Sequence, residues 1–578
     1  MAVINRRIGW LMAGFCALLS LAVLRAGQFG VLEAATLRRQ AVSEHVILQP
    51  LPAVRGSIVS SDGVTLAMSE AADEVIADPF LTSRDDLARY APKLSRLLGS
   101  SEAALLSALT RPGTGYVVLA REVTPQQAGA VMALHINGIN VTPEVRRVYP
   151  LPWTASQVIG TVNSAGAGDA GLEYEYNRVL AGRAGERRIV QDALGQSLSV
   201  DDTRAMRPGQ TLTLTLNAAL QSYVEQVLAG VGAQYHPKNA TAIVINPDTG
   251  AILALANWPR VDANEPGSPS EQDWMDQAVD FSYEPGSTFK AITVAGAIQD
   301  GLVNPSTEIY VPSVLQVYNR QIHDAEWHPG EMMTVAQILK VSSNIGAAKI
   351  GMMLGPQRFN HWVRAFGFGA PTGVDLPGEQ AGIVPEPSQY SGVSLANMPF
   401  GQGESVTPIQ MAAAYSAIAN GGWLRSPHIV SAIGGRAVPL PPAHRIISAS
   451  TAAELRDMLR GVFDDGGTAS GAAIPGYDLA GKTGTANVAV NGSYSTTEYI
   501  ASFIGMVPAA DPKLVVEVMV NQPQGSIYGG QVAAPAFKRI VGWAVPYFGI
   551  DPNPAGVSTS QTAASPGQQA GSASTPGG

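Results

Sequence analysis

Three short motifs follow one another along the chain, and each carries residues suited to acyl transfer. They are Ser287-Thr-Phe-Lys290, Ser342-Ser-Asn344 and Lys482-Thr-Gly-Thr485. A serine and a lysine three residues apart on a helix share one face, so Lys290 comes within reach of Ser287. A serine hydroxyl is a weak nucleophile near pH 7 unless a neighbouring base takes its proton. The first motif therefore predicts a serine nucleophile with a lysine base, on a helix whose N-terminal N–H groups can stabilise an oxyanion.

Each of the three motifs is weak evidence for catalysis by itself, and their occurrence together in this order is strong evidence. A serine–lysine pair alone is commonly a solvated helix face, and a Ser-x-Asn alone is commonly a turn or a cap. Gly481 and Gly484 bracket Lys482 in a strand-like context, where glycine lets another backbone approach closely. The ordered set S-x-x-K, S-x-N and K-T-G marks penicillin-binding proteins and class A β-lactamases.

Length and composition limit the alternatives. A chain of 578 residues is too long for one compact core and predicts two or three domains. The net charge of -9 and the absence of long basic runs argue against a nucleic-acid-binding face. Cys16 is the only cysteine, which excludes a disulfide within the chain. His323 and His328 lack an accompanying carboxylate–histidine helix motif, so we expect neither a metal nor another cofactor.

An uncharged, mostly apolar run covers residues 8–24, preceded by Arg6 and Arg7 and closed by Arg25. Such a run fits either a short membrane span or a long signal-peptide core. No small-x-small cleavage site follows closely, and helical spacing continues over 28–46, which favours an uncleaved anchor. The positive residues then place residues 1–7 in the cytoplasm and the rest outside the plasma membrane, as a single-pass protein.

The remaining pattern separates a pedestal region at 25–235 from a large domain at 236–548. Within the pedestal, residues 81–109 have helical spacing, interrupted by Pro92 and Gly99. The large domain combines apolar strands with helices, at 240–246, 251–256, 335–350, 411–419, 500–507 and 514–520. This mixture predicts an α+β fold, with a predominantly antiparallel sheet sandwiched by helices. Residues 549–578 are rich in Pro, Gly, Ser and Gln and predict a disordered tail.

The sequence resembles class B penicillin-binding proteins over nearly its whole length, and most of all their FtsI-type, division-specific branch. The stretches that carry this resemblance are Val341-Ser-Ser-Asn-Ile-Gly346, Pro399-Phe-Gly-Gln-Gly403 with Thr407-Pro-Ile-Gln410, Tyr499-Ile-Ala-Ser-Phe-Ile-Gly505, and Tyr528-Gly-Gly530 with Ala534-Pro-Ala-Phe537. One departure is Ser61-Asp-Gly63, where relatives often carry Asp-Arg-Asn-Gly. The resemblance implies the penicillin-binding, serine-transpeptidase fold, with a dimerisation-like pedestal.

The resemblance also implies roles for the motif residues. Ser287 would be the acylated nucleophile and Lys290 its neutral base, with a pKa lowered by burial and by the nearby cation Lys482. Ser342 would relay protons between the two lysines and the leaving amine. Asn344 would hold Lys290 and the substrate amide.

The third motif would bind substrate. Lys482, Thr483 and Thr485 would hold the terminal carboxylate of a D-Ala-D-Ala stem peptide. Gly484 would leave room for the substrate strand alongside. The backbone N–H groups of Ser287 and Thr485 would form the oxyanion hole. The implied reaction is peptidoglycan cross-linking, in which an amine of a neighbouring stem peptide attacks the acyl-enzyme, and β-lactams would be inhibitors.

The implied setting is septal cell-wall synthesis, with elongation and sporulation as the alternatives. We see no second enzymatic domain for polymerising glycan, so the resemblance implies a membrane-embedded FtsW-type SEDS glycosyltransferase and other divisome proteins as partners. The span carries small residues that could pack against another helix, namely Gly9, Ala13, Gly14 and Ala17. An ordinary lipid-facing anchor explains the same residues.

Two rival interpretations compete with a transpeptidase. A class A β-lactamase needs a loop glutamate followed four residues later by asparagine. The glutamates between Ser342 and Lys482 are Glu379, Glu386, Glu404 and Glu454, followed at that spacing by Ile383, Tyr390, Pro408 and Met458. Slow deacylation is therefore expected. A non-enzymatic scaffold or β-lactam sensor is the second rival, but the motif residues are intact and only residues 1–7 precede the span.

Overall fold

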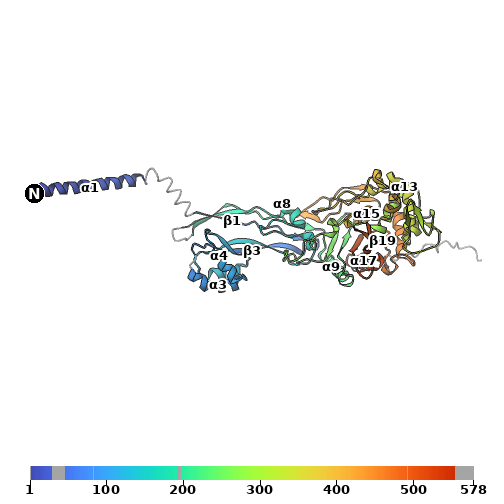
Figure 1. Ribbon diagram of the computed structural model, residues 1–578, viewed down its shortest axis with the longest axis horizontal. Helices are drawn as coiled ribbons and strands as arrows, with labels where there is room; N and C mark the ends of the chain where they lie inside the picture. The colour runs from blue at the N-terminus through green and yellow to red at the C-terminus, as the bar shows by residue number, and fades with distance from the viewer. Residues whose placement is uncertain (1, 29–45, 82–83, 192–196, 491–492, 553–578) are drawn as a thin grey trace, which may run out of the picture. The chain divides into compact units, whose positions relative to one another are not determined.

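The computed structural model describes residues 2–28, 46–81, 84–191, 197–490 and 493–552. It divides into two compact units (Figure 1). The first comprises Met1–Gly56, Ser69–Arg147 and Arg178–Gln210, and the second comprises Ser57–Met68, Val148–Asn177 and Thr211–Gly578. This division differs from the contiguous boundary predicted between residues 235 and 236. The predicted tail falls outside the described residues from 553 onward.

The first helix, α1 (Ala2–Gly27), contains the apolar run predicted at residues 8–24. The stretch Arg6–Gly27 within this helix has a mean hydropathy of 1.8, and it is not buried against the rest of the protein. By length and composition it could cross a membrane. Most of the helix predicted over 28–46 lies outside the described residues. Val46, its last residue, belongs to a strand instead.

The first unit contains a three-stranded antiparallel sheet and a small α/β lobe. The sheet has the order β1 (Val46–Leu51), β6 (Gly185–Gln191) and β7 (Ser197–Arg204). The lobe combines most of β3 (Thr65–Ala77), all of β4 (Val117–Val123) and most of β5 (Ile139–Val148) with three helices. These are α3 (Arg84–Leu98), α4 (Glu102–Leu109) and α5 (Pro125–Met132). Gly99, at φ +70°, separates α3 from α4 as predicted. Pro92 does not break the helix, because buried Ala91 and Leu94 hold α3 against the core.

A five-stranded antiparallel sheet forms the centre of the second unit. Its order is β10 (Ile252–Trp258), β9 (Asn239–Ile245), β21 (Leu514–Asn521), β20 (Ser493–Val507) and β19 (Ala480–Val490). All four pairings are antiparallel, which confirms the predicted sheet. Every residue of β21 is buried. Both faces of the sheet are therefore covered, whereas many antiparallel sheets leave one face in water.

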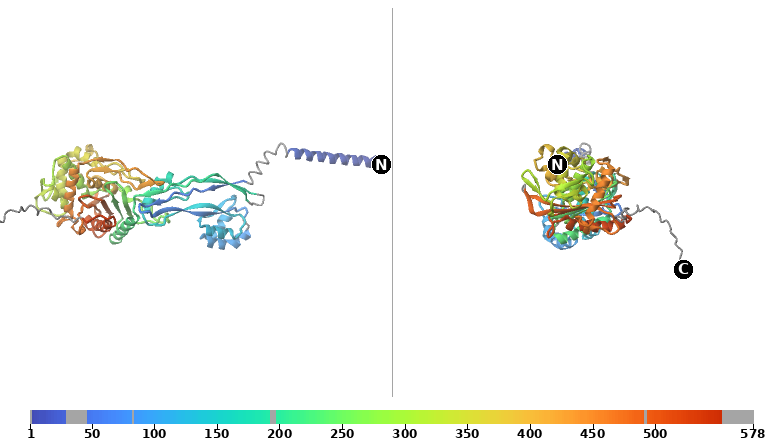
Figure 2. Two further views of the ribbon diagram at one scale, coloured as in Figure 1. Left: turned by 180° about the vertical axis from the view of Figure 1, so that it is seen from behind. Right: turned by 90° about the vertical axis from the view of Figure 1, so that its right-hand side faces the viewer.

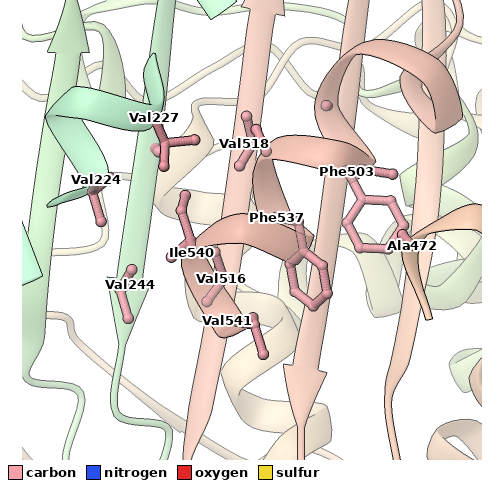
Figure 3. Packing of buried hydrophobic residues seen from close by; sticks show 14 of the residues in the cluster. Val224, Val227, Val244, Ala472, Phe503, Val516, Val518, Phe537, Ile540 and Val541 are labelled. Carbon is pink, nitrogen blue, oxygen red and sulfur yellow. The ribbon is translucent and has the colours of Figure 1, made fainter. Parts of the chain in front are cut away.

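Helices α9 (Ala218–Tyr235) and α17 (Gly529–Tyr547) cover one face of this sheet, and Figure 3 shows their packing against Val516 and Val518. Phe537 of α17 meets Phe503 of β20 with ring centroids 4.7 Å apart. Alternate residues of a strand point to opposite faces, so Glu517 faces the other layer. That layer includes α11 (Lys290–Gln299), α13 (Asn344–Ala365), α15 (Pro408–Ala419) and α16 (Ala449–Arg460), coloured green to orange in Figure 2.

Replacing Phe537 by alanine is expected to destabilise the second unit by about 3–5 kcal/mol, because the fully buried ring would leave a cavity between α17 and the sheet. Denaturant unfolding followed by tryptophan fluorescence measures this. Tyr318→Ala is the control, because that ring is 79% exposed and its loss should cost about 0.5 kcal/mol or less. Equal unfolding midpoints for the two variants would contradict the packing described here.

Candidate active site

Ser287 lies on a 3₁₀ turn, η2 (Gly286–Phe289), which runs directly into α11. The prediction that one α-helix carries both Ser287 and Lys290 is therefore wrong for the first turn, which is a 3₁₀ turn, and α11 begins only at Lys290. Pro285 and the left-handed Gly286, at φ +56°, impose the tighter turn. Side chains three apart eclipse one another in a 3₁₀ turn, so Ser287 and Lys290 still share one side. Ser287 is half-buried, while Lys290 is fully buried.

The serine turn is held by contacts that local sequence does not reveal. Gly286 N–H donates to the Gly401 carbonyl at 3.0 Å, and a Cβ on Gly401 would lie 2.2 Å from the Gly286 oxygen. The Tyr415 hydroxyl donates to the Thr288 carbonyl at 2.7 Å. Gly401 and Tyr415 come from segments more than a hundred residues away in sequence, and so position the nucleophile through the tertiary fold.

Two buried lysines meet at the hydroxyl of Ser342. Lys290 Nζ lies 3.2 Å from Ser342 Oγ, and Lys482 Nζ lies 2.8 Å from the same oxygen. Lys290 Nζ also donates to the Ser342 carbonyl at 2.5 Å and to Asn344 Oδ1 at 2.7 Å. The structure thus brings together four residues of the three predicted motifs. Among the described residues, no side chain hydrogen-bonds the Ser287 hydroxyl.

The lysine pair carries reduced positive charge. Burial lowers the pKa of Lys290 to about 7, against the opposing effect of the Asp324 carboxylate. Burial and the charge of Lys290 hold the pKa of Lys482 well below its usual range. Burial is thus the cause of the low Lys290 pKa, and the expected charge repulsion within the pair lowers the pKa of Lys482 instead. A neutral Lys290 has a free electron pair that can accept the Ser342 hydroxyl proton.

The third motif lies on β19, beside the serine turn. Thr483 Oγ1 donates to Thr468 Oγ1 at 2.9 Å, and Thr485 Oγ1 accepts from Gly529 N–H at 3.1 Å. A Cβ on Gly286 would lie 3.1 Å from the Thr485 carbonyl oxygen, so the turn and the strand adjoin. This places the backbones of Ser287 and Thr485 in one region. Their role as an oxyanion hole remains a prediction.

Gly484 has a packing reason that differs from the predicted one. A Cβ there would lie 2.2 Å from Ser502 Oγ, 3.0 Å from Thr288 Cγ2 and 3.1 Å from the Pro285 carbonyl oxygen. These atoms belong to β20 and to the serine turn. The absence of a side chain at Gly484 therefore lets β19 pack closely against the turn that carries Ser287.

Gly484→Ala is accordingly expected to slow acylation by fluorescent penicillin by roughly tenfold or more, because it pushes Thr288 and with it Ser287. Stopped-flow or gel-based acylation rates measure the effect. Gly471→Ala is the matched control, since a Cβ at Gly471 meets nothing within 4 Å. An unchanged rate in Gly484→Ala would contradict the contact.

The sequence interpretation missed Asp324, Thr468, Gly401 and Tyr415, although Gly401 lies in a stretch that carried the family resemblance. Within the described residues, no group of three or more His, Cys, Asp and Glu side chains is placed to hold a metal ion.

Comparison with known proteins decides the family. Residues 240–542 match the penicillin binding protein transpeptidase domain, and residues 50–214 match the penicillin-binding protein dimerisation domain. The chain belongs to the penicillin-binding protein family. Its relatives include FtsI-type proteins and it has the class B combination of domains, which confirms the family predicted from the motifs. The chain is thus an enzyme of the serine transpeptidase type.

Relatives of this penicillin-binding protein match it almost end to end. The probable peptidoglycan D,D-transpeptidase PenA of Neisseria gonorrhoeae is 30% identical, over 95% of this chain and 94% of the relative. Penicillin-binding protein PbpB of Mycobacterium tuberculosis is 34% identical, over 89% and 81%. Peptidoglycan D,D-transpeptidase FtsI of Escherichia coli is 29% identical, over 93% and 91%.

Solved structures agree with this assignment. The crystal structure of penicillin binding protein 3 from Mycobacterium tuberculosis, complexed with aztreonam, has a TM-score of 0.69 and 30% sequence identity. The match covers 88% of this chain and 98% of that chain. The penicillin-binding, serine-transpeptidase fold predicted for the chain is thereby confirmed.

Proposed function

We propose that this penicillin-binding protein is a peptidoglycan D,D-transpeptidase that cross-links stem peptides at the division septum. The observation that carries the proposal is the hydroxyl of Ser342, held between buried Lys290 and buried Lys482 beside the Ser287 turn. Relatives named D,D-transpeptidases support the substrate class. A buried, neutral lysine next to a serine suits nucleophilic attack at neutral pH.

The proposed first half-reaction forms an ester. Ser287 Oγ attacks the carbonyl carbon of the penultimate D-Ala, and its proton passes to Lys290. The oxyanion is stabilised by the backbone N–H groups of Ser287 and Thr485. The bond to the terminal D-Ala nitrogen breaks, and Ser342 passes a proton from the lysines to that leaving amine. Asn344 holds Lys290 through its amide oxygen.

In the second half-reaction, an amine of a neighbouring stem peptide attacks the ester carbonyl. The amine loses a proton to the lysines, the new amide forms, and Ser287 recovers its hydroxyl. Lys482, Thr483 and Thr485 bind the terminal carboxylate of the donor, which departs with D-Ala. A β-lactam enters the same first step and stays as the acyl-enzyme.

The test of the reaction is product analysis with the full-length protein. Nascent, uncross-linked glycan strands carrying pentapeptide stems are incubated with the enzyme, digested with a muramidase and separated. Cross-linked muropeptides with release of D-Ala are expected. Products that contain only hydrolysed tetrapeptides would show a carboxypeptidase and exclude the proposed transfer.

Septal action rests on the likeness of four sequence stretches to the FtsI branch. Sporulation is the alternative that a comparison favours, because stage V sporulation protein D of Bacillus subtilis is 32% identical over 87% of this chain. A functional fluorescent fusion is expected to concentrate at midcell in dividing cells, and depletion is expected to give filaments. Label along the lateral wall with rounded cells would indicate elongation, and label restricted to forespores would indicate sporulation.

We also propose that α1 anchors the protein in the plasma membrane as a single pass and contacts an FtsW-type SEDS glycosyltransferase. Its small residues, Gly9, Ala13, Gly14 and Ala17, would let another helix approach closely. Replacing residues 8–24 with an unrelated span should preserve penicillin binding and weaken co-purification of the polymerase. Unchanged co-purification of the variant would confine the contact to the outer domains. If the polymerase fails to co-purify even with the protein that carries its native span, the partner is excluded.

A further inference from the structure

A loop between β13 (Arg320–Ile322) and β14 (Glu331–Thr334) contacts the start of α13, where the second motif, Ser342-Ser-Asn344, leads into the helix. The Asp324 carboxylate accepts from Asn344 N–H at 2.5 Å, Ile345 N–H at 2.9 Å and the Ser343 hydroxyl at 2.6 Å. Ser343 Oγ in turn accepts from Gly346 N–H at 2.9 Å. Two side chains therefore satisfy the first three N–H groups of the helix.

His328 lies behind this carboxylate. Its Nε2 is 3.0 Å from Asp324 Oδ2, and its Nδ1 is 2.8 Å from the Pro329 carbonyl oxygen. Both partners accept hydrogen bonds only, so the geometry suits an imidazolium with a proton on each nitrogen. Burial alone would lower the pKa of His328, but the Pro329 carbonyl and the Asp324 and Glu331 carboxylates outweigh it and raise that pKa.

The same loop orients the catalytic amide. Asn344 Nδ2 donates to the His323 carbonyl at 2.9 Å, while Asn344 Oδ1 accepts from Lys290. The His323 carbonyl thus decides which end of the amide faces the lysine. Ser342 is left-handed, at φ +62°, a conformation that is unfavourable for a residue with a side chain. Such a conformation persists only when the surrounding contacts hold it.

We propose that Asp324, braced by His328, is a positioning residue for acylation. It holds residues 342–344 in the strained turn that keeps the Ser342 hydroxyl between Lys290 and Lys482. The reaction it serves is the one proposed above. Lys290 and Lys482 meet at Ser342 Oγ. The Asp324 carboxylate raises the pKa of Lys290 against burial, and the charge of Lys290 lowers the pKa of Lys482.

Asp324→Asn tests the proposal, because it keeps the size of the side chain and one acceptor oxygen but removes the charge. The second-order rate constant for acylation by fluorescent penicillin is expected to fall about 10-fold to 100-fold, as small misplacements of catalytic groups do. The acidic limb of its pH profile is expected to move to lower pH, since the carboxylate that raises the Lys290 pKa is gone. A merely structural role would lower stability without moving that limb.

Asp62→Asn is a matched control. Asp62 accepts from Ala218 N–H at 2.9 Å and from the Ser60 hydroxyl at 2.6 Å, and so caps α9 much as Asp324 caps α13. Helix α9 lies on the opposite face of the sheet. Asp62→Asn should lower thermal stability comparably and leave acylation unchanged. A wild-type rate and pH profile in Asp324→Asn, or an equal loss in Asp62→Asn, would overturn the proposal.

His328→Gln provides a second readout should Asp324→Asn fold poorly. Glutamine can still donate to Asp324 but carries no charge, so the carboxylate would act on Lys290 without its counter-ion. The acidic limb is then expected to move to higher pH, opposite to the shift in Asp324→Asn. An unmoved limb would reject the coupling. Both tests measure penicillin acylation only, so failure to cross-link glycan strands would count against the proposed function and not against this inference.

Discussion

Ser287→Ala is expected to abolish covalent labelling by fluorescent penicillin, with the acylation rate falling below detection. The alanine has no oxygen to form the ester, and neither Ser342 nor Thr288 can substitute. Ser342 Oγ is engaged by both lysines, and Thr288 Oγ1 donates to the Pro285 carbonyl at 2.8 Å within the turn. Labelling followed by denaturing gel electrophoresis and peptide mass mapping measures the result.

The control for this variant is Ser282→Ala, a half-buried serine in the irregular segment before the same turn, which should label as the wild type does. Circular dichroism and thermal unfolding would show that Ser287→Ala remains folded, because the side chain is only half-buried. A labelled peptide that still contains residue 287 in Ser287→Ala would refute the assignment. So would labelling of the wild type at a different serine.

Lys290→Arg is expected to slow acylation by about 10²-fold to 10⁴-fold, the usual contribution of a general base. A guanidinium stays charged at neutral pH and cannot take the serine proton. The wild-type rate should also depend on pH. Because the neutral amine is the active form and burial lowers the Lys290 pKa to about 7, the rate should be level above that pH and fall as pH drops through it.

Lys538→Arg is the control, since Lys538 is half-buried on α17 and its one hydrogen bond among the described residues goes to the Gly471 carbonyl. It should retain the full rate and the same pH profile. Acylation rates are measured across the pH range at constant ionic strength, with folding checked at each pH. A rate independent of pH between about 5 and 8, or an active Lys290→Arg, would exclude Lys290 as the base.

Much of the site could be predicted because its motifs are contiguous in sequence and occur in a fixed order. Ser287 and Lys290 are three residues apart, and either an α-helix or a 3₁₀ turn brings them to one side. The prediction that they share a side therefore does not depend on the type of helix, which was predicted wrongly for Ser287. The antiparallel sheet was predictable for a similar reason, because strands such as β9 and β10 are mostly apolar and joined by a turn.

What could not be predicted depends on contacts distant in sequence. Asp324 looks like any loop carboxylate until the fold places it against residues 343–345. The contacts that a Cβ on Gly484 would make with Thr288 and Ser502 also join segments distant in sequence, while the place of Gly484 beside the substrate stays a prediction. The compact units likewise interleave segments of the chain, and helical or strand periodicity says nothing of which unit a segment joins.

The buried lysine pair links ligand binding to protonation. Lys290 and Lys482 both contact the Ser342 hydroxyl, and both have lowered pKa values, so the site carries little positive charge near neutral pH. A carboxylate arriving there favours the charged form of the nearest amine, so occupancy and proton uptake from solvent are thermodynamically linked. Ligand affinity then depends on the pH of the surrounding solution, and the apparent binding enthalpy depends on the buffer that supplies the proton.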